Sequence, residues 1–371
     1  MDSKRSSAAF AVFAAGALLV AGCGTDQNIP SGGINPALEG LQVECGEQSI
    51  SAEGSSAQKN AMDVFARDYS LKCPGEQLNY TKSGSGKGVS AFNSGQIDFG
   101  GSDSPLDPED GEDKEAAARC GGNPAWNIPM VFGPVALSYN IPGVDDLTLS
   151  PEVAAGIYQG KITSWNDPAI QQLNPGTELP DLDIVPFFRS DESGTSENFQ
   201  EYLTTATDGA WTGEGKQFEP APGVGQGRDG SDQVAQSVQG TPGGFTYAEW
   251  SFPKNLGLGI AKVDSGSGPV ELSTENVGKA IESAEIGGEG HDLRVDLDSI
   301  YGNDAPGVYP IVLNTYEVVC SQGYDPETAK AVKALLTVAA NADPDQLEEA
   351  GYAALPEGFK QKVLDAVDAI A

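Results

Sequence analysis

Apolar residues along the chain follow two patterns, a helical spacing and short continuous runs. Residues 57–73 place Ala61, Val64 and Phe65 on one face of a predicted helix, while 127–141 and 309–320 are long apolar strand candidates. Further strands are predicted within 48–56, 76–88, 97–110, 183–190, 243–252 and 256–263, and further helices over 89–95, 150–170, 193–207, 325–341 and 356–371. Strands alternating with helices indicate the α/β class.

Small polar loops recur between a strand and the start of the next helix. They lie near residues 56, 85, 103 and 193. Ligands of open α/β sheets bind beyond the carboxyl ends of strands. The first N–H groups of a helix are free and carry a partial positive charge of about +0.5. Several such helix starts around one point predict a site for a small anion.

Composition limits the partners of this site. The 371 residues suit two domains, and 47 glycines with 24 prolines indicate many turns. With 54 Asp and Glu against 21 Lys and Arg, the net charge is −33. Binding to a nucleic acid backbone needs stripes of Lys and Arg, which this sequence lacks, so we expect no nucleic acid partner. An anion must therefore be held at short range.

The first 23 residues predict an export signal. Lys4 and Arg5 precede the small apolar run from Ala8 to Gly22, which is too short to span a membrane. The ending "LVAGC" resembles the bacterial lipobox, in which the cysteine, here Cys23, is lipidated and becomes the new N-terminus. The polar residues 24–43 predict a flexible tether.

Four cysteines remain after Cys23, and an even number in an exported chain indicates two disulfides with three possible connectivities. We favour Cys45–Cys73, which would tie the entry of the first strand to the end of the first helix, together with Cys120–Cys320. No Cys or His spacing typical of a metal site occurs, so neither a metal nor a cofactor is expected.

Motifs for catalysis are weak. "SGSGKGV" at 83–89 departs from a nucleotide P-loop at Thr81 and Gly88, so we interpret it as a backbone cradle for a small anion, with Lys87 facing solvent. His291 is the only histidine, and no GxSxG elbow surrounds Ser193. These observations argue against an enzyme.

Two charged residues are candidates for the anion site. Asp103, in "DFGGSDSPL", is either a helix N-cap or an acceptor that faces the ligand. An ionised carboxylate accepts a hydrogen bond from the P–OH of phosphate but repels sulfate, which has no proton to donate. Arg189 either pairs with a carboxylate such as Asp191 or grips an oxyanion, and one guanidinium can do both.

Six segments in order resemble one family: "GSSAQ" (54–58), "SGSGKG" (83–88), "DFGGSDSPL" (98–106), "GKITSWNDPAIQQLNPG" (160–176), "RSDESGTS" (189–196) and "YPIVLNTYEVV" (309–319). Together they resemble the phosphate-binding lipoproteins of bacterial phosphate ABC transporters over roughly residues 48–340. The resemblance implies a two-lobed periplasmic-binding-protein fold of type II, with two interdomain crossovers and a hinge. Lobe I would comprise 44–138 plus 312–371, and lobe II 139–311.

The resemblance also implies a phosphate site between the lobes. Its residues would be Ser56, Ala57 (through its N–H), Ser85, Asp103, Arg189, Ser193, Gly194 and Thr195. Two departures from the family are Ala57, where relatives often have Phe, and Glu192, which replaces a small residue and whose charge must point away. The implied protein is a monomer that is membrane-attached through Cys23 and delivers phosphate to a permease.

Other functions stay open at this point. The same fold could bind sulfate or molybdate, although Asp103 argues against both. A secreted phosphohydrolase or serine hydrolase belongs to another class, and the single histidine argues against it. A structural cell-surface antigen is the third alternative.

Overall fold

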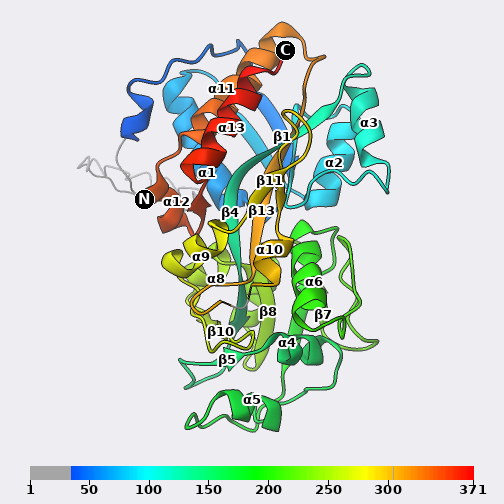
Figure 1. Cartoon of the computed structure of the whole chain (residues 1–371), viewed down its shortest axis with the longest axis vertical. Coiled ribbons are helices and arrows are strands. Elements are labelled where there is room, and N and C mark those ends of the chain that lie inside the picture. The colour runs from blue at the N-terminus through cyan, green and yellow to red at the C-terminus, as the bar shows by residue number, and fades with distance from the viewer. Residues whose placement is uncertain (1–34, 304) are drawn as a thin grey trace, which may run out of the picture.

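The computed structural model describes residues 35–371 except residue 304, and it has two halves, one above the other in Figure 1. The upper half contains α1 (Lys59–Lys72), α11 (Pro326–Ala340) and α13 (Glu357–Asp368). The lower half contains α4 (Pro151–Tyr158), α5 (Pro168–Leu173) and α6 (Gly194–Ala206). The strands β4 (Ala125–Tyr139) and β13 (Val312–Cys320) run through the waist between the halves.

One ten-stranded sheet extends through both halves. Its order is β2 (Leu78–Lys82), β1 (Ile50–Gly54), β3 (Phe99–Ser102), β13, β4, β8 (Gly244–Glu249), β6 (Val185–Arg189) and β7 (Gln226–Arg228), with β9 (Gly259–Ile260) and β14 (Ala353–Ala354) also paired to β4. β1 is parallel to β2 and β3, and β6 is parallel to β7 and β8. Parallel neighbours place their carboxyl ends at the same edge, which is where ligands bind in such sheets.

The long strand β4 belongs to both halves. Its residues 125–134 pair with β13, and its residues 135–139 pair with β8. All residues from 127 to 139 are buried, because helices and loops cover both faces of the sheet. This explains the continuous apolar run that predicted a strand over 127–141.

Each half has its own hydrophobic core. In the upper core, α1 buries Ala61, Val64, Phe65 and Tyr69, the face predicted from helical spacing. The lower core is rich in aromatic rings, and Tyr158 has its ring centroid 4.8 Å from that of Phe218. A third, smaller cluster around Val89 and Phe92 of α2 lies in the upper half, and the lower core also includes Phe132 of β4 at the waist. Because most of each core lies within one half, the halves can keep most of their internal packing if they move relative to each other.

The remaining elements are short, and their bounds are η1 (Pro36–Leu38), α2 (Ser85–Asn93), α3 (Glu112–Arg119), β5 (Thr148–Leu149), α7 (Ser231–Gln239), α8 (Ser251–Leu256), β10 (Lys262–Val263), α9 (Thr274–Ile281), β11 (Glu285–Gly287), β12 (Arg294–Asp296), α10 (Asp298–Tyr301) and α12 (Pro344–Ala350). Within residues 35–371 apart from 304, no helix is both long and apolar enough to cross a membrane.

The hairpin of β11 and β12 lies against the upper half, although the chain reaches it from the lower half (Figure 1). The backbone N–H of Leu293 donates to Asn127 O at 3.0 Å, and the Leu293 side chain joins the upper core. Asp292 Oδ1 accepts from the backbone N–H of Asn127 at 2.8 Å. The predicted lobe II of 139–311 includes this hairpin, so the structure places part of that range on the other half.

Both favoured disulfides are present, Cys45–Cys73 and Cys120–Cys320, with Cα–Cα distances of 5.6 and 5.4 Å. The predicted signal segment, Cys23 and residues 24–34 lie outside the described residues. The rest of the predicted tether differs from expectation, because Asn35 and Leu38 are buried and Asn35 Nδ2 donates to Asn341 O at 2.9 Å. A buried side chain with a distant partner is incompatible with a freely flexible segment.

Candidate functional site

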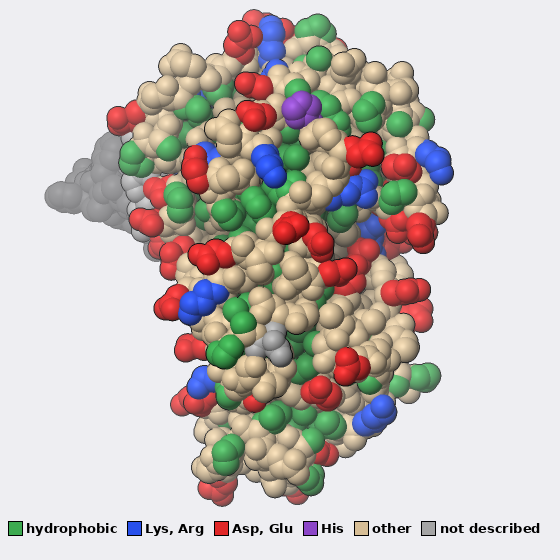
Figure 2. Space-filling model, in the orientation of Figure 1, with side chains coloured by type: hydrophobic (Ala, Val, Ile, Leu, Met, Phe, Trp, Pro, Cys, Tyr) green, Lys and Arg blue, Asp and Glu red, His purple; other side chains and the backbone are tan. Residues whose placement is uncertain are grey.

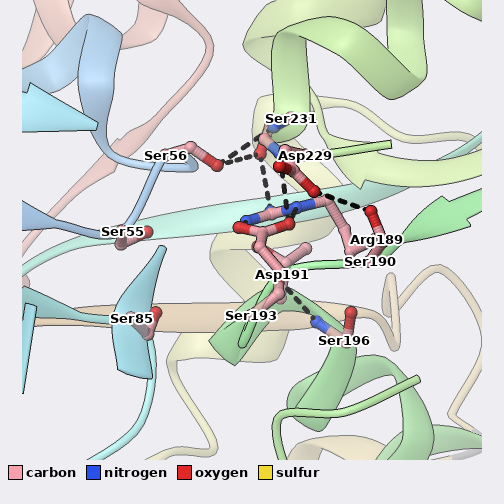
Figure 3. A network of polar contacts seen from close by, with 12 residues as sticks. Ser55, Ser56, Ser85, Arg189, Ser190, Asp191, Ser193, Ser196, Asp229 and Ser231 are labelled. Atoms are coloured by element: carbon pink, nitrogen blue, oxygen red, sulfur yellow. Dashed lines mark hydrogen bonds and ion pairs between the residues drawn. The ribbon is translucent and has the colours of Figure 1, made fainter. Parts of the chain in front are cut away.

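Polar groups from both halves meet where several strands end and helices begin. Figure 3 shows Ser55, Ser56 and Ser85 projecting from the upper half toward Arg189 and Ser231 of the lower half. The first two follow β1, Ser85 begins α2, Arg189 ends β6 and Ser231 begins α7. The predicted convergence of strand ends and helix starts is therefore found at the boundary of the two halves.

The upper side of the site is an internally bonded loop. Ser55 Oγ donates to Asp103 Oδ1 and accepts from the N–H of Ala57 at 3.0 Å. The N–H of Asp103 donates to Ser85 Oγ at 3.2 Å. The loop after β1, the loop after β3 and the start of α2 are therefore held together by Ser55, Asp103 and Ser85.

Asp103 is not a helix cap, because the next helix, α3, begins only at Glu112. The N-cap interpretation and the expected helix start near residue 103 are therefore wrong. The carboxylate is buried, and Thr195 Oγ1 of the lower half donates to its Oδ2 at 3.0 Å. Burial raises the pKa of Asp103, although the hydrogen bonds from Ser55 and Thr195 and the Arg189 charge oppose this shift. Asp103 thus faces the lower half as an acceptor.

Asp191 fixes the plane of the Arg189 guanidinium. Nε of Arg189 donates to Asp191 Oδ1 at 2.6 Å, Nη2 donates to Oδ2, and Nη1 donates to Ser231 Oγ at 3.2 Å. Burial tends to raise the pKa of Asp191, but the hydrogen bonds and charge of Arg189 outweigh it and hold this pKa below its usual range. Arg189 is only 2% exposed, so the ion pair is largely removed from water. The predicted pairing with Asp191 is confirmed.

The start of α6 presents the "SGTS" segment. Ser193 is the N-cap, and its Oγ accepts from the N–H of Ser196 at 3.2 Å. Gly194 lies so close to the upper half that a Cβ atom there would be 2.7 Å from Asp103 Cβ and 2.8 Å from Ser85 Oγ. The predicted residues Ser193, Gly194 and Thr195 therefore lie directly across from Asp103 and Ser85.

Ser231 was not predicted as a site residue. Its N–H donates to Ser56 Oγ at 3.0 Å, and the two hydroxyl oxygens are also 3.0 Å apart. Neighbouring Gly230 donates its N–H to Asp191 Oδ1 at 3.1 Å. The signal was available, because Gly230 and Ser231 precede an apolar spacing at Val234, Ala235 and Val238, which predicts a helix start.

Lys87 and Glu192 are two charged residues at the edge of the site, and the sequence raised the question of whether their side chains face the ligand or solvent. Lys87 is exposed, as expected. Glu192 is also exposed, and its backbone O accepts from the N–H of Gly86 at 3.1 Å while its carboxylate lies against Gly86. A carboxylate beside the first turn of α2 is favoured by the partial positive charge of that helix end.

The site offers hydroxyls, backbone N–H groups, the Arg189–Asp191 pair and the carboxylate of Asp103 in a buried setting. Within the described residues, no group of three His, Cys, Asp or Glu side chains could hold a metal ion. His291 packs edge-on against Trp126, with ring centroids 5.1 Å apart. Acidic side chains are spread over the face seen in Figure 2, including the waist, so attraction of an anion depends on these short-range groups.

Comparisons with known proteins show what the whole chain is similar to. The profile of the PBP superfamily domain matches residues 40–343. The Phosphate-binding protein PstS 3 of Mycobacterium tuberculosis (strain ATCC 25618 / H37Rv) is 46% identical, with all of both chains covered. The Phosphate-binding protein PstS of Methanocaldococcus jannaschii is 32% identical over 86% of each chain.

A solved structure of a phosphate-binding protein from Stenotrophomonas maltophilia has the same fold, with a TM-score of 0.64. It covers 86% of this chain and 94% of its own, at 21% sequence identity. At this identity the likeness extends to the fold alone, which is the two-lobed α/β architecture seen here.

Proposed function

The chain belongs to the PBP superfamily and, within it, to the PstS phosphate-binding proteins, and we propose that it captures inorganic phosphate between its two lobes. It is the extracytoplasmic substrate-binding protein of a phosphate ABC transporter and delivers phosphate to the permease. Sulfate or molybdate binding and hydrolase activity are not favoured by any relative named above.

The observation that carries the proposal is the buried carboxylate of Asp103 within an anion cradle. Arg189 supplies a positive charge, while Ser56, Ser85 and the α6 start supply neutral donors. Phosphate near neutral pH keeps at least one P–OH, which donates to Asp103. A fully ionised anion has no such donor and would face an unmatched negative charge.

In the proposed complex the ligand bridges the lobes. Ser56, Ser85 and Asp103 bind from lobe I, and Arg189, Ser193, Gly194 and Thr195 bind from lobe II. The Ala57 N–H, which donates to Ser55 Oγ in this structure, joins them by exchanging that bond for the ligand. Such bridging favours the closed arrangement over the open one by ligand-dependent population shift.

Ion pairs already join the two halves around the site. Lys82 Nζ lies 2.5 Å from Asp232 Oδ2, and Lys216 Nζ lies 2.8 Å from Glu112 Oε1. The first pair links β2 to α7, and the second links the segment after α6 to α3. These contacts support closure of the halves onto a bound ligand.

We also propose the finer points that follow from the sequence. Lipidation of Cys23 anchors the protein to the outer face of the cell membrane, and the protein acts as a monomer. Lobe I comprises 44–138 plus 312–371, with the β11–β12 hairpin of the 139–311 segment packed on it.

Calorimetric titration of the purified protein with phosphate, sulfate and a phosphomonoester tests the function. We expect tight binding of phosphate only. Arg189→Ala should weaken phosphate binding by at least about 30-fold, because losing one partner of a buried charge pair costs roughly 2 kcal/mol or more. Arg228→Ala is the matched control, since the Arg228 side chain bonds Ser237 and Gln226 outside the site.

Unchanged phosphate affinity in Arg189→Ala would contradict the assigned site. Preference of the wild type for sulfate would contradict the proposed ligand. Incubation with a chromogenic phosphate ester separates binding from hydrolysis, and turnover of that ester would favour the hydrolase alternative.

A further inference from the structure

A further carboxyl group, that of Glu317, is buried next to Gln58 at the end of the Ser55–Gln58 loop. Glu317 lies on β13 opposite Gly101 of β3 and Ile128 of β4, and it is only 1% exposed. Its Oε2 lies 3.5 Å from Nε2 of Gln58, which immediately precedes α1 and is fully buried. This carboxyl group contacts the loop through Gln58 and is not one of the predicted ligand-binding groups.

A chain of polar contacts connects Glu317 to the site. Nε2 of Gln58 donates to Tyr80 OH at 2.9 Å, and Tyr80 OH donates to Ser55 O at 2.8 Å. Gly101 provides the room for this chain, because a Cβ atom there would overlap the Gln58 amide and the Tyr80 hydroxyl. The chain ends at Ser55, the residue whose hydroxyl donates to Asp103.

Two acceptor atoms in this chain have no donor. Among the described residues, Oε1 of Glu317 and Oε1 of Gln58 are both buried without a hydrogen-bond partner. None of the ion pairs found there involves Glu317. An unmatched buried charge is more costly than an unmatched neutral acceptor. One proton on Glu317 removes the charge and converts an unmatched acceptor into a donor.

The surroundings of Glu317 favour that proton. Tyr80 from β2 and Asp103 from the loop after β3 are the titratable groups around it, and β4 contributes the apolar Ile128. Burial raises the pKa of Glu317 well above its ordinary value, against the hydrogen bond from Gln58, and the charge of Asp103 raises it further. Because neutral Glu317 adds no negative charge near Asp103, Asp103 remains the carboxylate that faces the ligand.

We propose that Glu317 is protonated and acts as a positioning residue, which seats the Ser55–Gln58 loop for the anion. The consequence for phosphate binding rests on the proposed function, whereas the protonation does not. Glu317→Gln keeps the shape and a donor in place of the proton. Glu317→Leu keeps much of the volume but removes the contact of the carboxyl group with the Gln58 amide, which then has only Tyr80 OH as its acceptor. Glu285→Gln, at an exposed glutamate of β11, is the matched control.

Thermal unfolding of the ligand-free proteins between about pH 4 and pH 9 tests the protonation. When folding raises the pKa of a carboxyl group, the folded protein loses stability as the pH rises from the unfolded-state pKa toward the folded-state pKa. The melting temperature of wild type should therefore fall progressively below that of Glu317→Gln as the pH rises, with a difference of about 2 °C or more at the alkaline end. Glu285→Gln should follow the wild type. Infrared difference spectra should show a protonated carboxyl band in wild type that is lost in Glu317→Gln.

Phosphate titration of the same proteins tests the positioning role. We expect the phosphate affinity of Glu317→Gln to lie within about twofold of that of wild type. The phosphate affinity of Glu317→Leu should be lower by about tenfold or more. Parallel melting profiles of wild type and Glu317→Gln, or an absent infrared band, would overturn the protonation, and wild-type affinity in Glu317→Leu would overturn the positioning. If wild type itself does not bind phosphate, the proposed function fails, while the melting and infrared results still decide the protonation.

Discussion

At the scale of single residues, Asp103 is shared by the two halves. Its Oδ1 accepts from Ser55 of the upper half, and its Oδ2 accepts from Thr195 of the lower half at 3.0 Å. Each carboxylate oxygen has two acceptor sites, so these bonds leave capacity for a P–OH donor. The same carboxylate can thus join the halves and address the ligand.

This arrangement predicts how selectivity depends on Asp103. Asp103→Asn should lower the ratio of phosphate to sulfate affinity by about tenfold or more, because the repulsive charge is lost while the size is kept. Since the pKa of Asp103 is raised, its charge is lost at a higher pH than for an ordinary Asp as the solution is acidified. Sulfate should therefore compete better at acid pH in wild type, with a weaker pH effect in Asp103→Asn.

Competition calorimetry with phosphate and sulfate over a pH series measures both effects, and melting curves of the ligand-free mutant check its fold. An unchanged affinity ratio in Asp103→Asn would refute the role in selectivity.

The sequence indicated the chemistry of the site better than its internal contacts. The helix starts at Ser85 and Ser193 were predictable, because each follows a strand and a small polar loop. The two donors to Asp103 were not predictable from local sequence, since Ser55 is 48 and Thr195 is 92 residues away along the chain. Ser231 was missed because the short apolar spacing of α7 was not recognised.

At the scale of elements, the start of α6 is packed against the loop after β3. Gly194 allows this approach, and the helix itself does not need a glycine there because its φ is not positive. In the open arrangement, where α6 has moved away from Asp103 and Ser85, Gly194→Ala should therefore leave ligand-free stability unchanged or raise it slightly, by up to about 1 kcal/mol. Phosphate affinity should fall by about tenfold or more, because the new Cβ holds the halves apart.

Gly278→Ala is the control for this prediction. Gly278 is also helical, in α9, and has no atom within 4 Å of an added Cβ. Paired calorimetry and melting curves of the two mutants measure the difference. Equal phosphate affinity in both would show that the approach of α6 to Asp103 is not needed for binding.

Elements with a strong apolar pattern were predicted, and those stabilised by distant contacts were not. The helices over 57–73 and 193–207 appear as Lys59–Lys72 and Gly194–Ala206. α3 gave no signal, because it is highly charged and Ala116 is its single buried residue. The strands β11 and β12 have three residues each, and their pairing is fixed by packing on the upper half.

At the scale of the whole molecule, the Cys120–Cys320 disulfide joins the ends of α3 and β13 in the upper half. The two cysteines are separated by 200 positions, a stretch that includes the whole lower half, whereas Cys45 and Cys73 are separated by 28. The chain-entropy relation gives about 5 kcal/mol for the longer loop and about 4 kcal/mol for the shorter one.

Replacing both Cys120 and Cys320 by Ser should therefore lower the free energy of unfolding more than replacing both Cys45 and Cys73. Denaturant unfolding of the two double mutants under identical conditions measures the order. The reverse order would show that native-state packing, and not loop length, decides the contribution of each disulfide.

The position of β13 in the sequence also determines the order in which the two halves can finish folding. It lies between β3 and β4, so the central strand of the upper sheet is supplied by residues 312–320, near the end of the chain. The lower half, by contrast, is encoded between the two segments of the upper half. As the exported chain emerges, the sheet of the upper half keeps an open edge until β13 arrives, so the half whose strands emerge first is completed after the other.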